Sequence, residues 1–255
     1  MEVFLNPDAW IALLTLTFLE IVLGIDNIIF ISIATGKLPA EKRKRATKIG
    51  MFLAMFMRIA LLFGINLLIQ MKEPWFHIDF SWFSAGVTGQ SVILLLGGLF
   101  LIYKSTNEIR EKVDERGEEE KEIKDAATRS FQNVILQIIM IDIVFSFDSI
   151  LTAVGMPNGV EGALYIMITA VVISVFIMMQ FAVPVGTFVN KHPSIQILGL
   201  AFLILIGMML LTESAHLSDA LIFGNHVTPL PKGYLYFAIT FSLVVEMINM
   251  KIKKK

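Results

Sequence analysis

Two acidic motifs hold the side chains of this chain that could do chemistry. The first reads EIVLGIDN from Glu20 to Asn27, and the second reads DIVFSFDS from Asp142 to Ser149, 122 positions later. Each motif has two acids six residues apart, inside a run that is otherwise apolar. A charged side chain at the centre of a bilayer costs about 2.5 to 3.5 kcal/mol on insertion scales, so acids in apolar spans indicate a functional site.

The donors in these motifs are the oxygen ligands that hard cations prefer. The candidate ligands are Glu20, Asp26, Asn27, Asp142, Asp148 and Ser149. The chain has no Cys, and its four His lie outside the apolar runs, so Mn²⁺, Ca²⁺ or Mg²⁺ fits better than Cu or Zn. A transported ion of this kind is the substrate, and no catalytic residue and no cofactor is expected.

Arg58 is the candidate charge partner of the acids. Four carboxylates and one guanidinium sum to a charge of −3, so a divalent ion would leave −1, which a proton could neutralise. Transport coupled to protons is therefore an open alternative to transport of the metal alone. The purely structural alternative is a salt bridge between Arg58 and one acid, with the other acids protonated.

The composition indicates a membrane protein. Of 255 residues, 56% are hydrophobic and 17% charged, and the mean hydropathy is +0.73. Runs of about 20 apolar residues predict membrane-spanning helices. Seven are predicted, at about 9–34, 47–71, 86–104, 131–155, 161–189, 195–213 and 233–250. The fold class is all-α and polytopic, and the N-terminus, which lacks a basic region and a cleavage site, is expected to keep its first span.

Basic residues predict the orientation of the helices. Eighteen of the 21 Lys and Arg residues fall in the linkers and tail of one side. Because positive loops stay inside, we expect the N-terminus outside and the C-terminus in the cytoplasm of a cell membrane. The basic linkers are explained by topology, so no nucleic-acid partner is expected. The charged linker 105–130 could be a solvated helical extension or a flexible loop, and the aromatic residues from Trp75 to Phe83 suit a belt at the outer interface.

The spacing of the motifs predicts an inverted repeat. Three helices, an odd number, separate the starts of the two motifs, so the motifs run in opposite directions through the bilayer. One domain over 1–255 would contain repeat one (about 9–104), repeat two (about 131–213) and a seventh helix (about 233–250). Such 3 + 3 repeats are common in transporters with sites near the midplane. Since residues six apart lie about 120° apart on a helix, convergence of all four acids predicts a bend or break near Gly24 and Ser146.

At these residues the chain resembles the TerC family of integral membrane proteins, named for tellurium resistance. The resemblance rests on LEIVLGIDNIIFIS, MIDIVFSFDSILTAVG, Arg58, the NKHPS turn from Asn190 and the closing PKGYLYFAITFSLVVEMIN. It implies a seven-helix exporter of metal ions, chiefly Mn²⁺, with tellurite and metal-stress phenotypes. The six ligand positions above match the acidic motif positions of the family. Ser149 stands where the first motif has Asn27, so the half-sites need not be equivalent.

Two other functions compete with export. A membrane assembly factor, or one that supplies metal to exported proteins, would need no flux of its own. An intramembrane aspartyl protease would need two paired aspartates, but this chain has Gly-Ile-Asp26 and Phe-Asp148 instead of the Gly-x-Gly-Asp context of such enzymes. The sequence therefore favours a protein that is not an enzyme. It does not indicate an oligomeric state.

Overall fold

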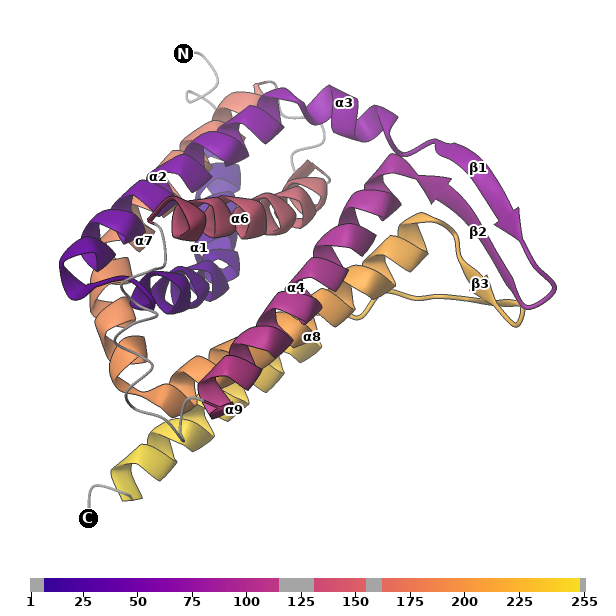
Figure 1. The fold of residues 1–255 in the computed structure, drawn as a ribbon. Coiled ribbons are helices and arrows are strands. Elements are labelled where there is room, and N and C mark those ends of the chain that lie inside the picture. Colours follow the sequence, from indigo (N-terminus) through magenta and orange to yellow (C-terminus); the bar gives the residue numbers. More distant parts are fainter. Residues whose placement is uncertain (1–6, 115–130, 155–161, 253–255) are drawn as a thin grey trace. The chain divides into compact units, whose positions relative to one another are not determined.

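The computed structural model describes residues 7–114, 131–154 and 162–252, except the side chains of 23, 25, 26, 66 and 151–154. Within this part of the chain, seven helices are long and apolar enough to cross a membrane (Figure 1). They are α1 (Pro7–Gly36), α2 (Ala40–Phe63), α4 (Gly89–Asp114), α6 (Phe131–Val154), α7 (Ala163–Lys191), α8 (Pro193–Leu217) and α9 (Lys232–Ile252). The prediction of an all-α, multi-pass membrane protein with seven spans is confirmed.

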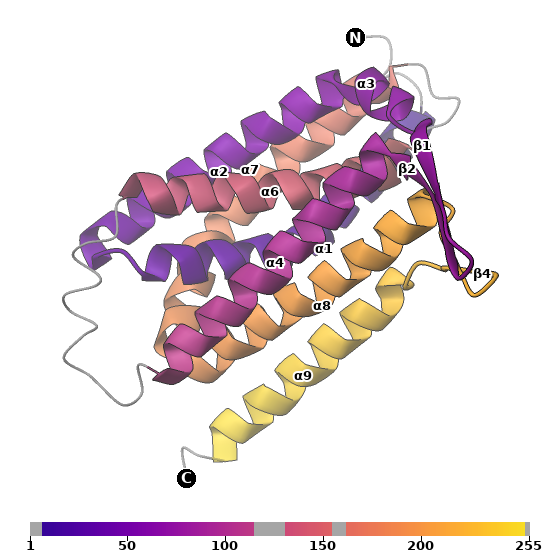
Figure 2. The same ribbon diagram turned by 45° about the vertical axis from the view of Figure 1, so that its right-hand side comes forward.

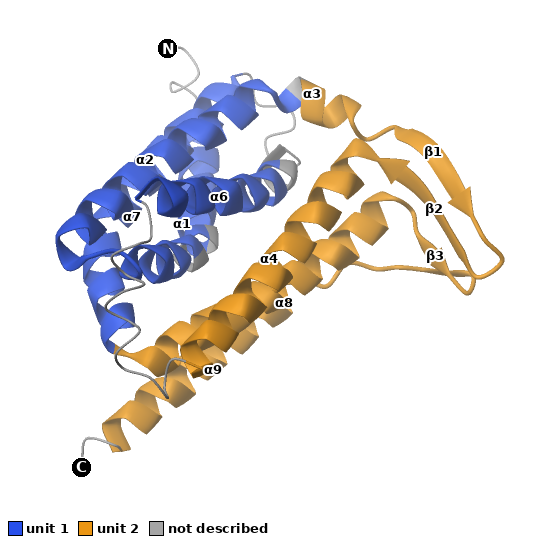
Figure 3. Cartoon of the chain, in the orientation of Figure 1, with its two compact units in different colours: residues 1–65, 120–191 blue, residues 66–119, 192–255 orange. Residues whose placement is uncertain are grey.

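The chain forms two compact units, coloured separately in Figure 3. Unit 1 covers 1–65 and 120–191 and contains α1, α2, α6 and α7. Unit 2 covers 66–119 and 192–255 and contains α4, α8, α9 and a small sheet. Each unit therefore takes helices from both halves of the predicted repeat. The prediction of one domain over 1–255 is not tested by this division.

Helices in unit 1 pack as two parallel pairs. Along the pair of α1 and α7, the contacts keep a constant offset in sequence, at Gly24 and Met178, Ser32 and Gly186, and Gly36 and Asn190. Along α2 and α6, Gly50 contacts Ile138, and Arg58 further along α2 contacts Asp142 further along α6. An inverted repeat that exchanges α1 with α6 and α2 with α7 would exchange these two pairs. The repeat itself stays a prediction.

In unit 2, α4 and α8 lie side by side over most of their length, as both ribbon views show (Figure 2). They run antiparallel, because Gly98 contacts Gly207 and Ser91 accepts a 2.6 Å hydrogen bond at its carbonyl oxygen from the hydroxyl of Ser214. A Cβ on Gly98 would lie only 2.7 Å from the carbonyl oxygen of Gly207. Small residues thus bring the two backbones together, as is usual between membrane helices.

A four-stranded antiparallel sheet in unit 2 was not predicted. It consists of β1 (Pro74–Asp79), β2 (Phe83–Thr88), β3 (Leu221–Ile222) and β4 (Asn225–His226), in that order, and a short helix, α3 (Ile65–Gln70), precedes it. The aromatic side chains of Trp75, Phe76 and Trp82 are exposed on it, which fits the predicted belt without testing it. Because these aromatic residues are typical of a membrane interface, the sequence did not indicate strands there.

The predicted cytoplasmic linker is helical in its first part. Helix α4 continues to Asp114, so residues 105–114 of the linker extend a membrane helix. Glu108 on this extension is almost fully buried and forms an ion pair with Lys104, with 3.1 Å between Oε1 and Nζ. Residues 115–130 lie outside the described part of the chain.

Candidate functional site

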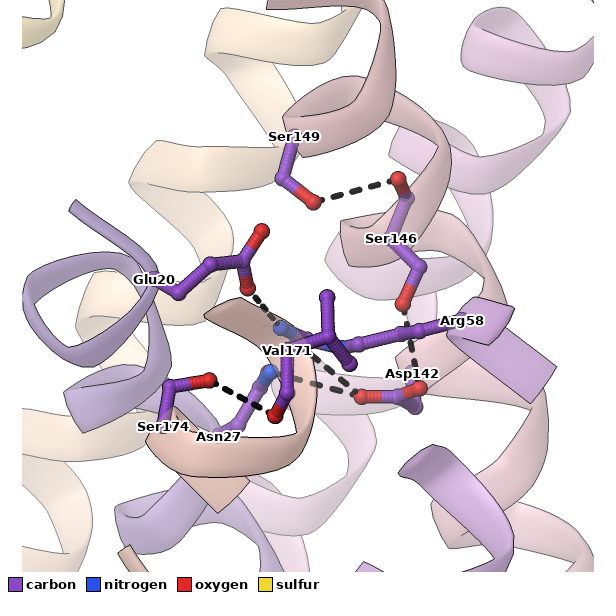
Figure 4. A network of polar contacts seen from close by, with 8 residues as sticks. All are labelled: Glu20, Asn27, Arg58, Asp142, Ser146, Ser149, Val171 and Ser174. Carbon is purple, nitrogen blue, oxygen red and sulfur yellow. Dashed lines mark hydrogen bonds and ion pairs between the residues drawn. The ribbon is translucent and has the colours of Figure 1, made fainter. Parts of the chain in front are cut away.

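The two motifs meet in unit 1 at the guanidinium group of Arg58. Nη1 of Arg58 donates to Oε2 of Glu20 at 2.5 Å, and Nη2 donates to Oδ1 of Asp142 at 3.2 Å (Figure 4). Glu20 is on α1, Arg58 on α2 and Asp142 on α6, so three helices are joined at one point. All three side chains are at least nine-tenths buried. Arg58 therefore pairs with one acid from each motif, where the sequence interpretation weighed a pair with one acid only.

Neither motif helix unwinds near Gly24 or Ser146, so the predicted unwinding is wrong, while a bend there stays a prediction. Helix α1 is continuous from Pro7 to Gly36 and α6 from Phe131 to Val154. The small residues have other roles. Met178 of α7 packs where a side chain on Gly24 would lie. Ser146, which is fully buried, donates its hydroxyl to Oδ2 of Asp142 at 3.1 Å, one helical turn away.

Continuous helices place the residues seven apart on one face. On α1, Asn27 shares the face of Glu20 and donates from Nδ2 to Oδ1 of Asp142 at 3.4 Å. On α6, Ser149 lines the same cavity as Glu20, and its hydroxyl donates to the carbonyl oxygen of Ser146 at 3.1 Å. Four of the predicted ligand residues, Glu20, Asn27, Asp142 and Ser149, are thus gathered around Arg58.

A small cavity adjoins this cluster. Its walls are Glu20, Arg58 and Ser149 together with apolar side chains of four helices, namely Leu16, Leu62, Ile150, Met167, Ala170 and Val171. The space open to the centre of a water molecule is about 10 Å³, close to what one water needs. The oxygens of Glu20 and Ser149 therefore border a space the size of one water or one small ion.

The two acids of the cluster differ in how well they are hydrogen-bonded. Asp142 accepts from Arg58 and Asn27 at Oδ1 and from Ser146 at Oδ2. Glu20 accepts at Oε2 only, from Arg58, and no partner for its Oε1 lies among the described residues. Glu20 therefore depends on Arg58, while Asp142 has partners of its own.

Whether the other two predicted acids join this network is not tested by the structure. The side chain of Asp26 lies outside the described residues. Asp148 is half-buried, and a continuous α6 turns it about 120° away from Asp142. Among the described residues, no group of three or more His, Cys, Asp or Glu side chains could hold a metal ion. The described cluster thus has two carboxylates, one guanidinium and three neutral polar side chains, those of Asn27, Ser146 and Ser149.

Sequence reasoning missed two hydroxyl groups near the cluster. Ser146 was read only as a small residue, although its position four after Asp142 puts it within hydrogen-bond reach on a helix. Thr17 lies three residues before Glu20, and its Oγ1 is buried with no hydrogen-bond partner in the described structure. Nothing in the sequence distinguishes Thr17 from an ordinary Thr in a membrane helix.

Comparison with known proteins links this architecture to one family. Residues 5–255 match the model of the integral membrane protein TerC family. The UPF0053 inner membrane protein YgdQ of Escherichia coli K12 is 47% identical over 250 residues, which are 98% of this chain and 96% of that protein. A UPF0053 protein of Haemophilus influenzae is 45% identical over 249 residues, with the same coverage.

Another relative is much longer than this chain. The UPF0053 inner membrane protein YoaE of Escherichia coli K12 is 42% identical over 250 residues, which are 98% of this chain but only 44% of that protein. The same membrane unit therefore occurs within a larger chain. No solved structure matches this protein.

Proposed function

Since the chain belongs to the TerC family of integral membrane proteins, we propose that it is a transporter that exports divalent metal ions, chiefly Mn²⁺. The membrane would be the inner membrane, which the names of two relatives specify for those proteins. Glu20, Asn27, Asp142 and Ser149 would bind the ion, with Asp26 and Asp148 as further ligands along its path. Exchange for protons is the predicted coupling.

One observation carries the proposal, the convergence of Glu20 and Asp142 from the two motifs on a buried point inside apolar helices. A duplicated acid pair is not needed to pack four helices, because apolar side chains of similar size would pack at lower cost. Acids kept inside spans are characteristic of ion pathways. The adjoining cavity supports the proposal, because it borders carboxylate and hydroxyl oxygens at a size that fits one ion.

The donor chemistry supports a hard cation. Glu20, Asp142 and Arg58 sum to a charge of −1, and the neighbouring donors are an amide and hydroxyls. Carboxylate, amide and hydroxyl oxygens suit Mn²⁺, Mg²⁺ and Ca²⁺. The competing protease mechanism needs two aspartates that share a proton, whereas the two acids that meet here are a Glu and an Asp bridged by Arg58.

Flux measurements in proteoliposomes test this function. The purified full chain is reconstituted, and uptake of Mn²⁺, Ca²⁺, Mg²⁺ and Zn²⁺ is followed at several pH values against empty vesicles. We expect saturable Mn²⁺ flux. Absence of flux for all four ions, with folded protein in the vesicles, would contradict export and favour an assembly or metalation factor.

A further inference from the structure

Arg58 occupies the place where a metal ion would bind in the proposed site. The guanidinium lies between Glu20 and Asp142, the two acids proposed as ligands, and bonds to both. It remains positively charged in proteins. A divalent ion bound by the same two carboxylates would place like charges a few ångströms apart in a low-dielectric interior, where repulsion is strong. Metal and guanidinium therefore compete for the same oxygens.

The described contacts indicate which bond the ion replaces. Asp142 keeps Asn27 and Ser146 as hydrogen-bond donors if Arg58 moves away. Glu20 has no other donor among the described residues, and its carboxylate lines the cavity together with Arg58. Movement of Arg58 off Glu20 without a replacement cation would leave a buried carboxylate uncompensated, which is strongly unfavourable. At Glu20, the departure of Arg58 and the arrival of the metal ion are therefore coupled.

We propose that Arg58 is the built-in counter-cation of the empty transporter: it offsets one of the two negative charges of Glu20 and Asp142 when no metal is bound, and the arriving ion displaces it. This role rests on the proposed metal transport. A transporter that has released its ion must return across the membrane without metal, and every carboxylate that neither a proton nor an internal cation compensates opposes that return in apolar helices. Arg58 supplies one compensating charge from within the chain. Metal-loaded protein does not need it.

A permanent structural salt bridge is the competing explanation of the same contacts. In that case Arg58 holds α1, α2 and α6 together in every state, and its loss impairs all transport modes equally. The counter-cation role instead separates two modes. Net export requires the return of the empty protein, whereas exchange of Mn²⁺ for Mn²⁺ uses only the loaded protein.

The test compares these two modes in proteoliposomes containing wild type, Arg58→Gln or Arg58→Lys. Net export is measured with Mn²⁺ on one side only, and exchange is measured with equal Mn²⁺ on both sides and a radioactive tracer on one. Arg110→Gln on α4 is the matched control, because Arg110 is exposed and its ion pair among the described residues is with exposed Asp114. Circular dichroism and size-exclusion chromatography establish that each variant is folded.

We expect Arg58→Gln to reduce net export at least tenfold while exchange stays within about threefold of wild type. Arg58→Lys keeps the charge but cannot bond to both acids as a guanidinium does, so its net export should lie between those of wild type and Arg58→Gln. If Arg58→Gln does not fold, the ratio of net export to exchange in Arg58→Lys decides, and it should fall. Equal losses of both modes, or no loss of either, would overturn the counter-cation role alone. A wild-type protein with neither mode would instead overturn the proposed function, and this role with it.

Discussion

Glu20 and Asp142, which hold equivalent positions in the two motifs, accept hydrogen bonds from a single guanidinium group at 2.5 and 3.2 Å. The cluster is therefore built jointly by the two motifs, and neither motif forms it alone. Because the acids sit on α1 and α6 and the guanidinium on α2, a change in the charge of the cluster acts on three helices at once. A cation bound there, as proposed, would act on the contacts of all three helices.

Neutralising the second acid of each motif should strongly reduce transport. We expect Asp26→Asn and Asp148→Asn each to reduce Mn²⁺ flux at least tenfold, because an amide keeps the shape of the side chain but not the charge that attracts a cation. Flux into proteoliposomes is the measurement, and Asp114→Asn, at an exposed position on α4, is the control. Wild-type flux in both Asn variants would remove these two residues from the ion path.

The sequence predicted the spans and one face of the site well, for clear physical reasons. Long apolar runs predict membrane helices, and the seven-residue spacing put Asn27 on the face of Glu20, as the structure confirms. The predicted unwinding near Gly24 and Ser146 was wrong, because Glu20 and Asp142 already meet at Arg58 between continuous helices. The two small residues serve packing and hydrogen bonding instead: Met178 packs against Gly24, and the hydroxyl of Ser146 donates to Asp142.

Other features could not be predicted because they depend on tertiary contacts. Strand β2 pairs with β3 across more than 130 residues of sequence, and β3 has only two residues, so no local alternation marks it. The pairing of Arg58 with two acids, rather than one, depends on how α2 packs against α1 and α6. Charge counting favoured an ion pair without specifying its geometry.

Thr17 offers a test that separates folding from transport. Its buried hydroxyl has no hydrogen-bond partner in the described structure, and such a group costs about 1 to 3 kcal/mol of stability. Thr17→Val keeps the shape and removes the polar atom, so the thermal unfolding midpoint in detergent should stay equal or rise by a few degrees. If the hydroxyl contacts the passing ion, Mn²⁺ flux should fall severalfold.

Thr169→Val is the matched control for this substitution. Thr169 is half-buried on α7, and its hydroxyl donates to the carbonyl oxygen of Tyr165 at 2.7 Å, so it lacks no partner. A lower unfolding midpoint in Thr17→Val would mean that the hydroxyl stabilises the fold. Unchanged flux with a higher midpoint would mean that Thr17 has no part in transport.

Single cysteines test the predicted orientation, since the chain has no native Cys. Asp114→Cys at the end of α4 and Asn225→Cys in β4 are exposed positions in unit 2. The charge asymmetry of the linkers predicts that Asn225→Cys reacts with an impermeant thiol reagent in intact cells and that Asp114→Cys reacts only after permeabilisation. Ala220 lies in the same predicted outer loop, but it is buried and therefore unsuitable for labelling. Reaction of both sites from outside would contradict the predicted topology and the inverted repeat.

Proton exchange is the remaining prediction, and it follows from charge balance. The four motif acids and Arg58 sum to −3, and a divalent ion reduces this to −1, so these five residues together with their ion carry a different charge with and without metal. Uncompensated charge in apolar helices is costly, and protons are the available cations that can offset the difference. Metal binding to carboxylates then releases protons, and transport becomes exchange.

Export driven in this way should respond to the proton gradient in a defined direction. With the inside pH held fixed, acidifying the outside strengthens the inward gradient and should speed Mn²⁺ export in proteoliposomes several-fold per pH unit. Glu20→Gln removes one carboxylate from the centre of the cluster, so it should flatten this dependence more than it weakens Mn²⁺ binding, which is measured separately by equilibrium titration. Asp114→Asn should leave the dependence unchanged. If wild-type flux follows metal concentration and membrane voltage but ignores the pH gradient, protons are not exchanged, and the acids act as ligands alone.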